Sequence, residues 1–336
     1  MFAASINSAL GRAGLLLMLA ASVFGALAVL YGIRQRDRRL LKQGPIYAWI
    51  AFGGIVLAVV MMQRALITRD FSLAYVQQVG SADTPTLYNI AAMWSALEGS
   101  ILLWALILAG FTAAVAWRFR KRTDDVLVGW ALIVMFVVTA FFAMLSFGPA
   151  DPFAAGAPGI TSGPGPNPLL QNHILVLFHP PILYLGYVGF TVPFAFAIAA
   201  LVTGRLGEGW LMETRRWALF SWAFLTIGIL LGGWWSYEVL GWSGVWAWDP
   251  VENASLLPWL TGTAYIHSVL VQERRGMLRV WNLSLLVATF ALTILGTFLT
   301  RSGILSSVHA FGDGPVGNWL LAFFGVVVVV SLGLIA

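Results

Sequence analysis

The sequence predicts an all-α, polytopic membrane protein with about nine transmembrane helices. Of its 336 residues, 60% are hydrophobic and only 10% are charged, whereas a water-soluble domain has about 25% charged residues. Apolar stretches of roughly 20 residues, the length that crosses a bilayer as a helix, recur along the whole chain. This composition excludes a soluble globular protein, a disordered chain and a nucleic-acid binder, although the net charge is +5.

The apolar stretches give the predicted spans in chain order. The first of them could be mistaken for a signal peptide, but it is too long, and five basic residues follow it directly. We therefore interpret it as an anchor. The last stretch has no polar residue after Ser331, so we expect the chain to be a fragment of a longer protein. The predicted spans are 13–33, 45–67, 92–117, 126–147, 174–202, 216–233, 255–272, 280–300 and 319–336.

The distribution of positive charge predicts the orientation of these spans. The loops after spans 1, 3, 5 and 7 hold 15 of the 19 Lys and Arg residues. Positive residues collect on the cytoplasmic side of a membrane, so the N-terminus is predicted to lie outside and Ala336 inside. The outer side then carries the other four basic residues and the long loops, which are rich in Gly, Pro and Trp.

The predicted organisation has three parts. Residues 1–233 hold spans 1 to 6 with their outer loops, residues 234–259 form an outer Trp-rich segment, and residues 260–336 hold spans 7 to 9. The Trp-rich segment has six Trp in 26 residues, whereas the chain average would give about one. Such a cluster of indole rings suits a large, flat aromatic ligand, although an aromatic belt at the membrane interface is the alternative. The candidate ligand-binding rings are Trp234, Trp235, Trp242, Trp246 and Trp248.

Asp249 begins the pattern Asp-Pro-Val-Glu, which has a structural explanation of its own. An Asp at the N-cap, Pro at the first helical position and Glu252 three residues after the cap form an Asp-headed capping box. Asp249 is therefore a candidate for ligand binding or catalysis, and equally a candidate for a purely structural cap. Proton transfer could involve any of three acids, and their spacing in the sequence does not favour one of them. These acids are Glu238, Asp249 and Glu252.

Four histidines are the candidate metal ligands, because the chain has no Cys. His267 lies within a predicted span, where ionisable groups are costly and usually functional. His179 precedes two prolines that are expected to start a helix at the outer mouth of span 5, and His309 lies in the outer loop after span 8. Neutral imidazole is a common axial ligand of haem iron, so the two outer histidines suggest a bis-histidine haem site. Ordinary surface histidines remain the alternative, and His173 is expected to be a plain loop residue.

Arg301 is the candidate partner for an anionic ligand. The ionisable residues of the Trp-rich segment are acidic, so they cannot pair with haem propionates, whereas Arg301 ends span 8 on the same outer side. The alternative is an arginine that anchors the end of its helix in the interface.

With these residues in view, the stretch from Trp246 to Trp259 resembles the WWD motif of the haem-handling superfamily of CcmF, CycK and CcsA. The resemblance covers essentially the whole chain, and it favours the CcmF family of haem lyases over the shorter CcsA family. The segments that carry it besides the WWD motif are Trp94 to Trp104, Asn167 to Gln171, His179 to Gly189, and Thr300 to His309.

The resemblance implies a function in a bacterial cytoplasmic (inner) membrane, with the WWD segment on the periplasmic side. It implies that the Trp motif holds haem brought by the chaperone CcmE, and that His179 and His309 ligate the iron of this substrate haem. It also implies a permanent haem b ligated by His267 and by a second His beyond residue 336. The implied reaction attaches haem through thioether bonds to the CxxCH segment of apocytochrome c, with a CcmH-type thiol reductase presenting the apocytochrome.

Two other function classes stay open at this stage. A haem transporter would need polar or broken helices along a path at the midplane of the membrane, and apart from His267 the spans offer little of this. A membrane cytochrome b for electron transfer would need paired histidines on facing helices within the membrane. Only His267 is expected at such a depth, because His179 is expected at the outer mouth of span 5.

Overall fold

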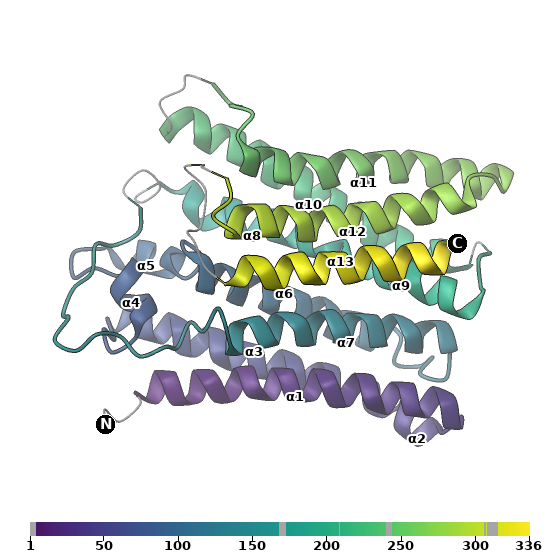
Figure 1. The fold of residues 1–336 in the computed structure, drawn as a ribbon, viewed down its shortest axis with the longest axis horizontal. Helices are drawn as coiled ribbons and strands as arrows, with labels where there is room; N and C mark the ends of the chain where they lie inside the picture. Colours follow the sequence, from purple (N-terminus) through teal and green to yellow (C-terminus); the bar gives the residue numbers. More distant parts are fainter. Residues whose placement is uncertain (1–4, 168–172, 208, 240–243, 306, 308–314) are drawn as a thin grey trace.

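Long apolar runs of the sequence form long helices that lie side by side (Figure 1). The computed structural model describes residues 5–167, 173–207, 209–239, 244–305, 307 and 315–336. Its helices are α1 (Ile6–Gln35), α2 (Arg38–Leu41), α3 (Gln43–Ile67), α4 (Ala74–Val79), α5 (Thr86–Ala92), α6 (Leu97–Arg118), α7 (Val126–Phe147), α8 (Leu175–Gly189), α9 (Thr191–Thr203), α10 (Gly209–Val239), α11 (Pro250–Arg275), α12 (Arg279–Arg301) and α13 (Val316–Ile335).

The all-α, polytopic fold class is confirmed, and eight of the nine predicted spans coincide with described helices that are long and apolar enough to cross a membrane, whereas the ninth stays a prediction. Within the described residues, eight helical segments are long and apolar enough to cross a membrane, with α2 and α3 counted as one segment and α8 and α9 as another. The predicted span at 255–272 falls in α11, which has 26 residues but is not among the eight. Polar residues such as Asn253, His267 and Gln272 make α11 the least apolar of the long helices, although it runs alongside them (Figure 1).

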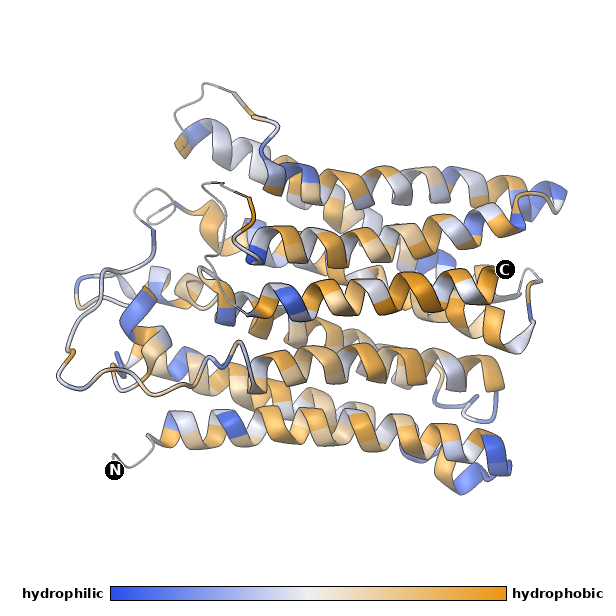
Figure 2. Cartoon of the chain, in the orientation of Figure 1, coloured by the Kyte–Doolittle hydropathy of each residue, from blue (hydrophilic) through white to orange (hydrophobic). Residues whose placement is uncertain are grey.

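The connections expected on one side of the membrane do lie together. The α1–α3, α6–α7, α9–α10 and α11–α12 connections share one end of the bundle, and the N-terminus and the long loops share the other (Figure 1). Apolar residues fill most of the length of the helices, and hydrophilic residues gather mainly toward the ends (Figure 2). We call the end with α4 and α5 the outer end, following the charge distribution of the sequence.

Ion pairs hold the connections together at the inner end. Asp125 caps α7, where its carboxylate accepts the backbone N–H of Leu127. The same carboxylate accepts hydrogen bonds from Arg122 at 2.7 Å and from Arg205 at 2.9 Å, and Arg122 also pairs with Glu213 on α10. One carboxylate thus joins the α6–α7 and α9–α10 connections.

Replacement of Asp125 by Ala is expected to lower the free energy of unfolding by about 1 to 2 kcal/mol, since it removes an N-cap and two partly exposed ion pairs. Burial raises the pKa of Asp125, but the hydrogen bonds from Arg122 and Leu127 outweigh it, so the pKa lies below its ordinary value. A carboxylate with a depressed pKa stabilises the folded state at pH values above its ordinary pKa. This stabilisation is lost as the pH falls through the pKa of the folded state. Thermal denaturation in detergent should therefore show a lower melting temperature for Asp125→Ala than for the unsubstituted protein at neutral pH. This difference in melting temperature should shrink below about pH 4. The melting temperature of Asp125→Asn, which can still cap α7, should lie between those of the unsubstituted protein and Asp125→Ala.

Candidate functional site

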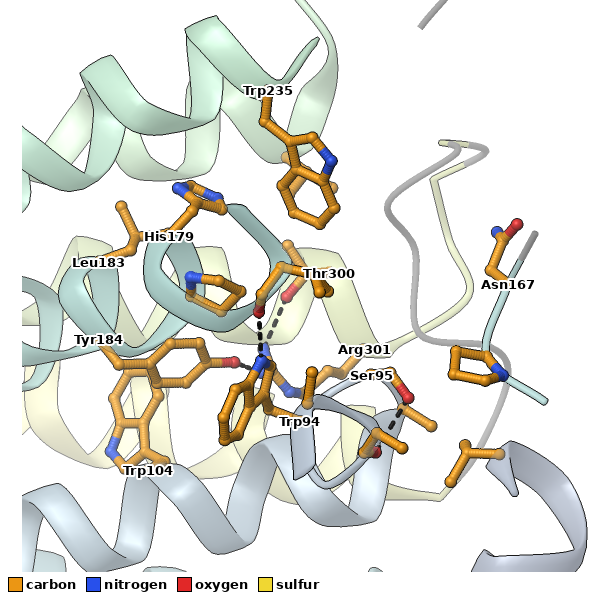
Figure 3. A pocket seen from close by; sticks show the side chains of 18 of the residues that line it. Trp94, Ser95, Trp104, Asn167, His179, Leu183, Tyr184, Trp235, Thr300 and Arg301 are labelled. Atoms are coloured by element: carbon orange, nitrogen blue, oxygen red, sulfur yellow. Dashed lines mark hydrogen bonds between the residues drawn. The ribbon is translucent and has the colours of Figure 1, made fainter. Parts of the chain in front are cut away.

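A cavity of about 420 Å³ lies near the outer end of the bundle, between α5, α6, α8, α11 and α12 (Figure 3). We call it the aromatic cavity. No Asp or Glu is among the described residues that line it. The lining residues that matter for its chemistry are Trp94, Trp104, His179, Tyr184, Tyr187, Trp235 and Arg301. A second cavity of about 80 Å³ adjoins it, and His179 and Trp235 border both.

Close packing of α8 on α10 brings His179 to the Trp-rich segment. A Cβ atom on Gly186 of α8 would lie 2.1 Å from the backbone nitrogen of Leu225, and one on Gly228 of α10 would lie 2.6 Å from the Cα of Leu183. Only glycine permits backbones to approach so closely. As a result, the Nδ1–H group of His179 donates to the carbonyl oxygen of Gly228 across the two helices, at 2.8 Å.

His179 does not stand at the start of its helix, as the sequence predicted. Helix α8 begins four residues earlier, at Leu175, and Pro180 lies inside it. Proline has no N–H to give to the carbonyl four residues before it, which here is Val176. The indole N–H of Trp94 donates to that carbonyl instead, at 2.8 Å. The proline is therefore tolerated because a side chain from the α5–α6 junction takes over the missing hydrogen bond.

The predicted Trp platform is divided between helix and loop. Trp234 and Trp235 lie on the last turns of α10 rather than in a loop. Trp235 is half-buried, and its ring meets the His179 ring edge-on at 5.6 Å. Trp246 packs at a right angle to Trp248, with 6.1 Å between ring centroids, and Trp248 is 70% exposed. Trp242 lies outside the described residues.

Three indole N–H groups beside the two cavities are buried and have no acceptor within the described structure. They belong to Trp104 and Trp235, which line the aromatic cavity, and to Trp246, which lines the smaller one. A buried donor without an acceptor is costly. These groups therefore point to a ligand that supplies acceptor atoms.

Asp249 has the structural role that the sequence left open. Its carboxylate accepts the backbone N–H of Val251 and the hydroxyl of Ser307 at 2.7 Å. Glu252 accepts the backbone N–H groups of Asp249 and Ala247, which completes the capping box of α11. Both acids thus order the Trp246–Trp248 turn, and the catalytic role suggested for Asp249 stays a prediction.

Arg301 is buried, with 3% of its surface exposed, and it lies at the base of the aromatic cavity (Figure 3). Its guanidinium group donates to hydroxyl groups of three helices, those of Ser100 (3.0 Å), Thr300 (2.8 Å) and Tyr184. It is therefore held inside the bundle and does not extend into the interface as an anchor. This arrangement adds a fixed positive charge to the cavity.

His173 is not the plain loop residue that the sequence suggested. Its Nδ1 atom accepts the backbone N–H of Leu175 at the start of α8, and its Nε2–H donates to Glu238 of α10 at 2.6 Å. Glu238 also accepts the indole N–H of Trp234. His173 thus ties α8 to the end of α10, a role that depends on two helices meeting and that no local pattern could reveal.

His267 lies on α11, with its side chain exposed at the surface of the bundle. Its Nδ1–H group donates to the carbonyl of Thr263 at 2.9 Å. This bond fixes the tautomer in which Nε2 carries the lone pair, as in most metal-bound histidines. His309, the other predicted ligand, lies outside the described residues.

Sequence reasoning missed the part of the site formed by α6 and α8. Trp104, Tyr184 and Tyr187 line the aromatic cavity, and the two tyrosine rings meet the Trp104 ring edge-on at 5.8 and 5.6 Å. A usable signal was present, because His179, Leu183 and Tyr187 follow one another at helical spacing and so share one face of α8.

Comparisons with known proteins agree with this architecture. Residues 94–305 match the family model described as "Cytochrome C assembly protein". The protein called "Cytochrome c-type biogenesis protein CcmF" in Pseudomonas aeruginosa is 45% identical over 97% of this chain and 50% of its own length, and that of Escherichia coli strain K12 is 43% identical over the same shares. The solved structure titled "Cytochrome c Heme Lyase CcmF" matches with a TM-score of 0.85 and 40% identity, over 100% of this chain and 52% of that one.

The chain thus spans about half the length of the relatives that it matches. The matched residues 94–305 include the aromatic cavity's histidine, its Trp rings and Arg301, together with the capped helix α11 and His267. On this match, the chain belongs to the cytochrome c assembly protein family.

Proposed function

We propose that this chain forms the haem-holding half of a cytochrome c haem lyase. The observation that carries the proposal is the composition of the aromatic cavity. It combines a histidine of fixed tautomer, several aromatic faces, a buried arginine and buried indole N–H groups, and no acid is among its described lining residues. Haem is a flat aromatic ring with an iron that binds imidazole and two anionic propionates, so each of these features has a counterpart in it.

Substrate haem is proposed to enter with its propionate edge toward Arg301 and its vinyl edge toward the outer surface. His179 holds the iron from one face, and His309, which lies outside the described residues, is proposed to hold it from the other. Trp235, Trp246 and Trp248 are proposed to support the ring, together with Trp234 and with Trp242, which lies outside the described residues. The side chains thus fix which edge of the ring remains accessible.

The proposed reaction adds a thiol of apocytochrome c across each haem vinyl group. A carbon–sulfur bond forms at one vinyl carbon, and the thiol proton ends on the other, so no oxidant or reductant is consumed. Because the chain has no Cys, both thiols come from the CxxCH segment of the substrate. The proposed partners are the haem chaperone CcmE, a CcmH-type subunit that presents the apocytochrome, and apocytochrome c itself.

His267 fits one half of a haem b site within the membrane. Its exposed position on α11 leaves the imidazole accessible from outside this bundle, so His267 would hold haem b together with a residue outside these 336. When bound, haem b supplies electrons that keep the substrate haem reduced. The contribution of this chain is to hold the His267 ring by the Thr263 carbonyl.

Arg301 offers the most direct test of how haem is oriented. Arg301→Gln removes the charge but can still donate to the surrounding hydroxyls, so we expect maturation to fall about tenfold or more, the effect of losing one buried charged hydrogen bond. Arg301→Lys should retain part of the activity. The measurement is covalent haem staining of c-type cytochromes in a strain that depends on the complete gene product. Wild-type maturation by Arg301→Gln would remove the arginine from the proposed site.

The proposed location is a bacterial inner membrane, with the Trp-rich segment on the periplasmic side. The natural absence of Cys allows a clean test by cysteine labelling. We expect Ser162→Cys, in the exposed loop after α7, to react with a membrane-impermeant maleimide in intact cells. Arg120→Cys, between α6 and α7, should react only after the cells are opened. Labelling of Arg120→Cys in intact cells would invert the topology.

A further inference from the structure

One face of α10 holds the His179 ring through two glycines and a tryptophan. Gly228, Gly232 and Trp235 follow one another at intervals of four and three residues, which places them on the same side of the helix. The Gly228 carbonyl accepts the Nδ1–H of His179, and Trp235 meets the imidazole ring edge-on. Between these two contacts, the ring lies against the helix at Gly232.

Gly232 matters because it has no side chain. A Cβ atom built there would lie 2.7 Å from Cε1 of His179, 3.2 Å from Nδ1 and 3.3 Å from Nε2. The first distance is too short for any real contact, and all three concern the imidazole ring rather than the end of a flexible chain. Even a methyl group at position 232 would therefore displace the ring.

We propose that Gly232 and the Gly228 carbonyl form an imidazole seat, which positions His179 as a ligand of the substrate haem iron. The inference rests on the proposed function, since it presupposes that His179 binds this iron. It assigns a positioning role to Gly228 and to Gly232, one helical turn apart on α10. Gly228 sets the tautomer, and Gly232 sets how closely the ring approaches α10.

The contact between Gly232 and the His179 ring can be distinguished from the close packing of the α8 and α10 backbones. Gly228 also permits backbone contact, because a Cβ there would strike the Cα of Leu183, so its substitution would disturb the helix pair as a whole. At Gly232, by contrast, the nearest atoms to an added Cβ are all in the His179 ring. Position 232 is therefore where the seat can be tested without altering the packing of the two backbones.

The first experiment is Gly232→Ala in the complete gene product. We expect cytochrome c maturation to fall about 10- to 100-fold, the usual effect of disturbing a group that orients a metal ligand. The substrate haem should lose its low-spin optical signature, while the b-type spectrum stays unchanged. Gly325→Ala is the matched control, because it lies inside α13 and an added Cβ would have nothing within 4 Å. Gly209→Ala, at the start of α10 and equally open, controls for substitution in the same helix.

A second experiment remains valid even if Gly232→Ala fails to accumulate. In His179→Gly the ring is absent, so a methyl group at position 232 has no imidazole to strike. Added imidazole should restore the low-spin signature of the substrate haem in His179→Gly. It should do so poorly in His179→Gly combined with Gly232→Ala, where the methyl group occupies the seat.

The outcomes separate the seat from the proposed function. Equal rescue of the single and double variants, or full maturation by Gly232→Ala, would overturn the seat while His179 remained a ligand. Full maturation by His179→Gly without imidazole would overturn the ligand assignment itself.

Discussion

Replacement of His179 by Ala should abolish cytochrome c maturation while leaving the b-type haem spectrum of the purified protein intact. His179 is the described histidine that borders the aromatic cavity, and its Nδ1–H bond to Gly228 leaves Nε2 as the nitrogen that carries the lone pair. Loss of an axial ligand removes an interaction worth well over 1.4 kcal/mol, so we expect a decrease of at least about tenfold. Haem staining of c-type cytochromes measures maturation, and an optical spectrum of the same preparation measures haem b.

The comparison variants have graded expected effects. His309→Ala should match His179→Ala if the two histidines hold the iron from opposite faces. Trp248→Ala should weaken haem retention only gradually, because contacts with the ring are shared among several indoles whereas the iron has two axial positions. Full maturation by His179→Ala would exclude the bis-histidine arrangement.

Replacement of His267 by Ala should eliminate the low-spin b-type spectrum. The side chain lies on the exposed face of α11, and its Nδ1–H bond to Thr263 holds the ring in the tautomer that a metal requires. The purified complete gene product, reduced with dithionite, provides the measurement. Gln272→Ala is a useful control, because Gln272 lies on the same helix but is buried, and its amide accepts a hydrogen bond from Asn282. An unchanged spectrum in His267→Ala would assign His267 a structural role.

The sequence predicted the helices well, because the signals for them are local. Apolar runs of sufficient length and alternating positive charge identify membrane-spanning helices without any knowledge of packing. The predicted span at 255–272 stays a prediction for the same reason. Helix α11 is as long as its neighbours and packs beside α12. It carries His267, Gln272 and other polar groups, so its composition alone does not identify it as a membrane span.

The site was predicted less completely, because much of it depends on contacts between helices. His179, Trp235 and Arg301 could be chosen by residue type, and the structure places all three on one cavity. The partnership of His173 with Glu238 joins residues 65 positions apart, and no spacing rule could have indicated it. The capping box at Asp249 was visible in the sequence because capping is local, and the hydrogen bonds confirm it.

Because of the hydrogen bond from Trp94 to the Val176 carbonyl, the effect of a substitution at Trp94 depends on which residue stands at position 180. Trp94 supplies a donor to a carbonyl that Pro180 cannot serve. With Pro180 in place, loss of the indole leaves that carbonyl without this donor. With Pro180 replaced by a residue that has an N–H, the helix can supply its own donor, and the same loss becomes mild. The effects of substitutions at these positions therefore cannot be summed, and the order in which they arise determines which of them a functioning protein tolerates.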